Sequence, residues 1–211
     1  MGNPTKAYRC YEKIIAIDPE NRRAAELVLP IYEKEGNFRR QVDIHLGLLA
    51  TAGGDAEKLA IMKQLVFLYG DKLGNTRDAF ARAVEAHALA PDDPDVLQSI
   101  EVYGEKTASW DELIAIYCKR AESLKGNRLI EIQKKLARVL YRNAGRMQEA
   151  LGVYEGVLKA NPDDEEAYAA VEEILKSMGK LADLLALYEK RLQTVKESEE
   201  KVRLLKDMAK I

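Results

Sequence analysis

The chain has 211 residues, of which 47% are apolar and 32% are charged, so it has material for a core and a well-solvated surface. Its 33 basic and 35 acidic residues are mixed along the chain and give a net charge of −2. This balance excludes the strong basic excess of a dedicated nucleic-acid-binding protein, so no nucleic-acid partner is expected.

Apolar residues recur at intervals of three and four, which predicts helices, and strand signals are nearly absent. Short clusters of Gly, Asn and Asp separate the apolar segments. The predicted helices, in chain order, span about 4–17, 20–35, 39–52, 55–71, 76–89, 94–106, 110–124, 127–143, 147–160, 164–178, 181–196 and 198–211. Because the connections are short, consecutive helices are expected to be antiparallel neighbours, in either a closed bundle or an open stack.

An internal repeat favours the stack. One proline-containing corner appears three times at almost even spacing, at Pro19, Pro91 and Pro162. Three alanines precede these prolines, each at the same distance: Ala7, Ala79 and Ala150. A small residue lets two helix backbones approach closely, so these alanines are expected at close helix crossings. Large rings repeat with the same period in the intervening helices: His45, Tyr117 and Tyr188.

The segment "YRNAGRMQEALGVYEGVLKANP", residues 141–162, resembles the second half of a tetratricopeptide repeat. It has Gly145, the small Ala150, the aromatic Tyr154 and the closing Pro162 in that family's spacing. "NPTKAYRCYEKIIAIDP" and "LYGDKLGNTRDAFARAVEAHALAP" match the same half. The other three hairpins are degenerate, because a larger side chain occupies the small-residue position: Gln41, Leu113 and Leu184.

The resemblance implies an all-α fold, a right-handed α-solenoid of about six antiparallel hairpins that forms a single repeat domain over residues 1–211. Its parts are a half hairpin 1–19, hairpins at about 20–54, 55–91, 92–126, 127–162 and 163–197, and an unpaired helix 198–211. The two half hairpins suggest a segment of a longer array. Val202, Leu205, Met208 and Ala209 would then lack a cover, which predicts self-association through the terminal helices or fraying of residues 198–211.

Residues suited to chemistry are few, and no enzymatic activity is expected. The two histidines, His45 and His87, lack a second ligand at metal spacing and are interpreted as packed rings. Cys10 and Cys118, each next to a core tyrosine, are interpreted as partly buried, inert thiols. Two unpaired cysteines favour a reducing, cytoplasmic location. No cofactor, metal site or membrane insertion is predicted, since no run of 18 apolar residues occurs.

The resemblance implies a non-catalytic scaffold that binds a partner protein or peptide through the concave face of the superhelix. On the helix at 127–143, four basic residues lie opposite the apolar side: Lys134, Lys135, Arg138 and Arg142. This basic stripe is the candidate partner-binding site, suited to an acidic peptide or a C-terminal carboxylate. The alternatives are that the stripe is a solvated face, with Glu131 paired to Lys135, and that the chain is a structural spacer with no partner.

Overall fold

The computed structural model describes residues 4–211, with side chains from Ala7 onward, and these residues form twelve α-helices and no strand. The helices of the first half are α1 (Pro4–Ile17), α2 (Arg22–Glu35), α3 (Phe38–Ala50), α4 (Asp55–Phe67), α5 (Thr76–Leu89) and α6 (Pro94–Lys106). A π-helical turn, η1 (Leu68–Lys72), extends α4. The helices of the second half are α7 (Trp110–Ser123), α8 (Asn127–Arg142), α9 (Met147–Ala160), α10 (Glu165–Ser177), α11 (Leu181–Thr194) and α12 (Ser198–Met208).

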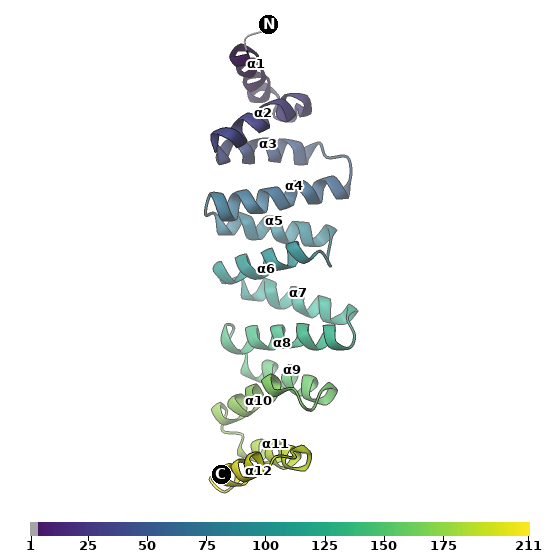
Figure 1. The fold of residues 1–211 in the computed structure, drawn as a ribbon, viewed down its shortest axis with the longest axis vertical. Helices are drawn as coiled ribbons and strands as arrows, with labels where there is room; N and C mark the ends of the chain where they lie inside the picture. Colours follow the sequence, from purple (N-terminus) through teal and green to yellow (C-terminus); the bar gives the residue numbers. More distant parts are fainter. Residues whose placement is uncertain (1–3) are drawn as a thin grey trace. The chain divides into compact units, whose positions relative to one another are not determined.

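These helices belong to two compact units, and the boundary follows Ser109. Unit 1 contains α1 to α6, and unit 2 contains α7 to α12. Within each unit, consecutive helices run antiparallel and pack side by side (Figure 1). The predicted all-α stack of hairpins is confirmed, and every predicted helix is present. We call α2, α4, α6, α8, α10 and α12 first helices and the others second helices, after their place in the hairpins.

The proline corners form because each one is followed by a capped helix start. The N-cap residues Asn21, Asp93 and Asp164 follow Pro19, Pro91 and Pro162 at the same distance. Each side chain accepts a hydrogen bond from a backbone N–H in the first turn, from Ala24, Val96 and Ala167 respectively. Such caps satisfy amide groups that have no partner inside the helix. The corner therefore ends one helix and starts the next with the same chemistry each time.

Small residues line the core at two of the three predicted positions. Ala79 and Ala150 are fully buried, as expected for close helix crossings. Ala7 is exposed, so the prediction is wrong at this position. The physical reason is that α1 is the first helix of the described residues, and no preceding helix among them packs against it. In the degenerate hairpins, Gln41 is buried and its amide donates to the carbonyl oxygen of Tyr32 at 3.0 Å.

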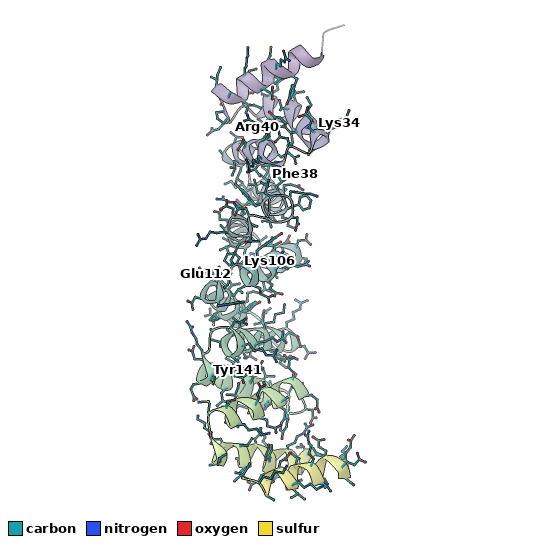
Figure 2. The ribbon with its side chains drawn as sticks, turned by 90° about the vertical axis from the view of Figure 1, so that its left-hand side faces the viewer. Lys34, Phe38, Arg40, Lys106, Glu112 and Tyr141 are labelled. Atoms are coloured by element: carbon teal, nitrogen blue, oxygen red, sulfur yellow. The ribbon has the colours of Figure 1, made fainter. Side chains whose placement is uncertain are left out.

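The predicted ring positions are buried, since His45, Tyr117 and Tyr188 are each at most 8% exposed. The Nδ1 atom of His45 lies 2.7 Å from the carbonyl oxygen of Gln41, one turn earlier in α3. His45 is therefore a packed ring, as the sequence indicated. Elsewhere in unit 1, Lys34 and Phe38 flank the turn between α2 and α3 (Figure 2).

Candidate partner-binding surfaces

Helix α8 carries the basic stripe and buries its opposite side. Ile132, Leu136 and Leu140 are buried in unit 2, which confirms the predicted apolar side of this helix. Of the four basic residues, Lys134 and Lys135 are half-buried, whereas Arg138 and Arg142 are exposed. The four side chains thus share one helix but differ in their surroundings.

Lys134 connects α8 to the start of α10. Its Nζ lies 3.3 Å from a carboxylate oxygen of Asp164, 3.2 Å from Glu166 and 3.4 Å from Glu131. Its side chain is only 13% exposed. Desolvation alone would lower the pKa of Lys134, but the hydrogen bonds to Glu166 and Asp164 outweigh this effect and raise it. Because Asp164 is also the N-cap of α10, Lys134 fixes one first helix against the next.

The same contact recurs in unit 1. It lies one repeat period earlier in the sequence, a repeat period being the spacing between successive proline corners such as Pro91 and Pro162. The Nζ of Lys63 in α4 lies 2.7 Å from Asp93, the N-cap of α6, and 3.0 Å from Asp95. These residues correspond to Lys134, Asp164 and Glu166. We call this arrangement the lysine clamp. Its recurrence indicates that Lys134 has a structural task in the repeat, which the sequence analysis missed although the shared spacing was there to find it.

The remaining stripe residues lie beside the clamp. Arg138 forms an ion pair with Glu166, and the hydrogen bond to Arg138 helps to hold the pKa of the Glu166 carboxyl below its usual value. Arg142 is exposed at the end of α8. The hydroxyl of Tyr141, labelled in Figure 2, donates to Glu173 of α10 at 3.0 Å. Arg138 and Tyr141 therefore join α8 to α10 beside the clamp, whereas Arg142 makes no hydrogen bond or ion pair with α10 among the described residues and faces solvent.

Unit 2 also has a groove of about 400 Å³ between the second helices α9 and α11, with α10 as its floor. Its floor and walls are mainly apolar, with Leu158, Val171 and Leu187 among them. Tyr168 and Arg191 also line it, and the guanidinium carbon of Arg191 lies 5.1 Å from the centre of the Tyr168 ring. We call this the α9–α11 groove. Sequence reasoning did not identify it.

Arg191 is held firmly in place on the wall of this groove. Its side chain is 8% exposed, and its nitrogens lie 2.7 Å from Glu165 and 3.1 Å from Glu200. A third carboxylate, that of Asp163, is 3.8 Å away. A buried arginine is costly unless its charge is matched, and these carboxylates supply the match. Arg191 therefore joins α11 to α10 and α12.

The other chemically notable side chains do not gather into a site. Both Cys10 and Cys118 are exposed free thiols, so the interpretation of partly buried thiols is wrong. Each cysteine is one position from a tyrosine that faces the helix stack, and one position rotates a side chain by about 100° around a helix. Within residues 4–211, no group of His, Cys, Asp and Glu side chains has the arrangement of a metal site. Over the same range, no helix combines the length and apolar character needed to cross a bilayer.

Comparison with known proteins agrees with this architecture. Residues 134–168, from the middle of α8 to the start of α10, match the family model described as tetratricopeptide repeat. The chain superposes on a structure of Naa15/Naa10 bound to HypK-THB with a TM-score of 0.63 and 13% identity, covering 99% of this chain and 31% of that one. It thus spans about a third of the length of that chain. Among proteins with curated function, no relative is found by sequence.

Two further solved structures are similar at lower scores. Yeast Tom70 has a TM-score of 0.45 and 17% identity, over 99% of this chain and 43% of Tom70. A kinesin light chain with TPR-like repeats from Podosopora anserina has a TM-score of 0.46 and 17% identity, over 82% of this chain and 93% of that one.

Hairpins that repeat with one corner, one cap and one set of small residues define a helical-repeat protein. The family model matches residues 134–168, so this segment is similar to a tetratricopeptide repeat, as its sequence resemblance indicated.

Proposed function

We propose that this chain is a non-catalytic scaffold that binds a partner protein or peptide through the first helices, on the concave face of its superhelix. The observation that carries this proposal is the repeat itself: stacked helical hairpins, similar to tetratricopeptide repeats at residues 134–168, which display a large surface to a partner. The similar fold of the Naa15/Naa10 complex occurs in a structure bound to a further protein, HypK-THB, which is in line with a partner-binding role.

Within this proposal, the basic stripe is the binding site, and its members have different tasks. Arg138 and Arg142 are exposed and can reach a partner's carboxylates, for which arginine has a matching two-pronged geometry. Lys134 is engaged by three carboxylates, so it contributes by keeping α10 beside α8. Lys135 adds positive charge next to both. A partner of acidic character, or one that ends in a free carboxylate, suits this surface.

The test is capture of partner proteins from an extract by the immobilised chain. The variant Arg138→Glu with Arg142→Glu should abolish capture of an acidic partner and leave the melting temperature nearly unchanged, because exposed ion pairs contribute only about 0–1 kcal/mol. The matched control is Arg23→Glu with Arg39→Glu, two exposed arginines of unit 1. Added salt should weaken the specific capture.

Two outcomes would decide against the stripe. Capture that resists both the double substitution and salt would make the stripe an ordinary solvated face. If the chain captures no protein at all, the alternative function becomes the better one, namely a structural spacer within a repeat array. In that case these charges would serve only to form the lysine clamp and the ion pairs around Glu166.

A further inference from the structure

Unit 1 has a groove of about 550 Å³ between the second helices α1 and α3, with Tyr32 of α2 on its floor. We call this the α1–α3 groove. Its accessible apolar side chains include Ile15, which is half-buried, and Leu46, which is 37% exposed. Ala16 and Ala50 are exposed and add only methyl groups to the walls. The groove is therefore open to apolar side chains that project from another helix.

The side chains that line the α1–α3 groove carry an excess of negative charge. Glu12 lies on α1, Asp43 on α3 and Glu20 at the corner before α2. Arg40 is the only basic side chain in this lining, and it lies 3.7 Å from Asp43, so the lining has a net charge of −2. The hydroxyl of Tyr32 donates to Glu12 at 2.9 Å, which fixes this carboxylate beside the groove. A surface with positive charge on both of its sides is therefore complementary to the groove.

The matching groove of unit 2 shows that the fold does not require this acidic character. The lining positions of the α9–α11 groove correspond to those of the α1–α3 groove, two repeat periods later. Three positions differ in charge or size, and the residues of unit 1 and unit 2 are, in order, Ala16 and Lys159, Asp43 and Ala186, and Gly47 and Lys190. At Gly47, a Cβ atom would lie 2.0 Å from the carbonyl oxygen of Pro19, so a lysine does not fit there. The open, acidic groove is thus particular to unit 1.

Helix α12 has an exposed face that is complementary to this groove. Val202 and Leu205 form its apolar part and are 50% and 52% exposed. Because successive residues of a helix are rotated by about 100°, Lys201 lies about 40° beyond Leu205 on one flank, and Lys206 lies about 40° beyond Val202 on the other. Both lysines are exposed and make no ion pair within residues 4–211, whereas Glu199 is the only exposed acidic residue of α12. We call Val202, Leu205 and the two lysines the α12 ridge.

We propose that the α12 ridge of one copy of this chain docks into the α1–α3 groove of a second copy. The apolar part of the ridge covers Ile15 and Leu46, as an amphipathic helix covers an apolar groove. The lysines on its two flanks face the carboxylates of Glu12 and Asp43 on the two walls. Each copy carries one ridge and one groove, so the contact is heterologous and joins copies head to tail.

The experiment uses two variants that each lack one half of the contact. The ridge variant is Val202→Glu with Leu205→Glu. The groove variant is Ala16→Lys with Asp43→Ala, which introduces the residues that unit 2 carries at these positions. In sedimentation velocity, we expect each variant to be monomeric alone and an equimolar mixture of the two to form a complex of one copy of each. This complex cannot grow, because only one complementary pair of surfaces remains in it.

The matched control for the groove variant is Ala60→Lys with Asp55→Ala, which makes the same two changes at exposed positions of α4 and should associate like the wild type. A second groove variant, Glu20→Lys, changes an exposed residue outside the helices and should weaken association by at least about tenfold, since it reverses a charge at the contact. Added salt should also weaken association.

Three results would overturn the inference. If the groove variant still associates alone, the α12 ridges pair with each other rather than with the groove. If the mixture of the two variants forms no complex, the ridge and the groove do not meet. If the control on α4 loses association as the groove variant does, the effect is not particular to the groove. None of these results affects the basic stripe, because Arg138 and Arg142 belong to neither surface.

Discussion

Ala108 adopts a backbone conformation that is normally reserved for glycine. Its φ angle is 53°, and the residues at the equivalent turn of the neighbouring repeats are Gly36 and Gly179, both with a φ of 65°. All three follow a first helix and precede a second helix. A side chain in the left-handed region is strained by the contact of its Cβ with the following carbonyl group, at a cost of roughly 1–2 kcal/mol.

The variant Ala108→Gly should therefore stabilise the chain. The relieved strain exceeds the extra entropy of an unfolded glycine, and the expected gain is about 0.5–1 kcal/mol. Chemical denaturation monitored by helical circular dichroism measures it. The reverse substitutions Gly36→Ala and Gly179→Ala should each lower stability. A gain in stability from either one would contradict the argument that a side chain is strained at this turn.

Ala150 shows the opposite constraint, since it has no room for a larger side chain. It is fully buried in α9, and its neighbours are fixed by two other helices. Ala150→Leu should overpack the crossing and cost about 1–3 kcal/mol. The exposed Ala7, which has the same place in the sequence repeat, offers a matched control, and Ala7→Leu should have little effect. If Ala150→Leu melts at the wild-type temperature, Ala150 is not at a close crossing.

The lysine clamp joins successive first helices at two places, α4 to α6 and α8 to α10. The hydrogen bond to Asp93 raises the pKa of Lys63, and the same bond lowers the pKa of the Asp93 carboxyl. A carboxyl group whose pKa is lower in the folded chain stabilises the fold at pH values above its pKa in the unfolded chain, and this stability is lost as the pH falls through the pKa of the folded chain. A lysine whose pKa is higher in the folded chain stabilises the fold at pH values below its usual pKa of 10.5, and this stability is lost as the pH rises through the pKa of the folded chain.

We accordingly expect the clamp to contribute fully to the stability of the fold at neutral pH and to lose this contribution at low pH and at high pH. The double variant Lys63→Met with Lys134→Met should melt below the wild type at pH 7. The difference in melting temperature should shrink below about pH 4 and above about pH 10.5. The control, Lys119→Met with Lys159→Met, removes two exposed lysines that form no ion pair within residues 4–211, and it should give a difference that is small at every pH. A constant difference for the clamp variant would mean that its ion pairs do not contribute to stability.

The sequence predicted the helices well because each boundary is a local event. A proline and a change of apolar spacing are read within a few residues, and they predicted helix starts at about 20, 94 and 164, close to the observed starts at Arg22, Pro94 and Glu165. The ion pairs of Lys134 were not predicted, because they join residues 30 positions apart on different helices. Exposure of Cys10 and Ala7 was also missed, since it depends on which neighbours are present rather than on the helix itself.

The α9–α11 groove shows the same limit more clearly. Tyr168 and Arg191 lie on different helices, and nothing in the local sequence of either one indicates that the ring and the guanidinium group meet. The only available signal was the comparison of repeats, in which alanine and leucine occupy the same positions of the first hairpins, at Ala25 and Leu48. Departure from the repeat, rather than agreement with it, marks the unusual residues.

At the scale of the whole molecule, the exposed apolar side chains of α12 predict self-association. Val202 is 50% exposed and Leu205 is 52% exposed, whereas Leu204 is buried against the rest of unit 2. Burying such side chains recovers roughly 25 cal/mol per Å² of apolar area. Sedimentation velocity over a range of concentrations should therefore show growth in mass.

Val202→Glu with Leu205→Glu should return the chain to a monomer, because a charged face resists burial. Leu27→Glu, which changes a comparably exposed leucine of α2, should not. A wild-type chain that stays monomeric at every concentration contradicts the prediction, and so does association that survives the double substitution.

The two lysine clamps have the same spacing, so the segment between them can be removed and the remaining lysine can pair with the remaining carboxylates. Lys134 stands 30 positions before Asp164, and Lys63 stands the same distance before Asp93. Removal of residues 91–161 would join Ala90 to Pro162, and Lys63 would then stand at that distance from Asp164, with Glu166 in the place of Asp95. This deletion thus keeps the spacing between the lysine and its carboxylates at the new junction. A family built in this way can change its length in single genetic steps, without having to evolve a new contact each time.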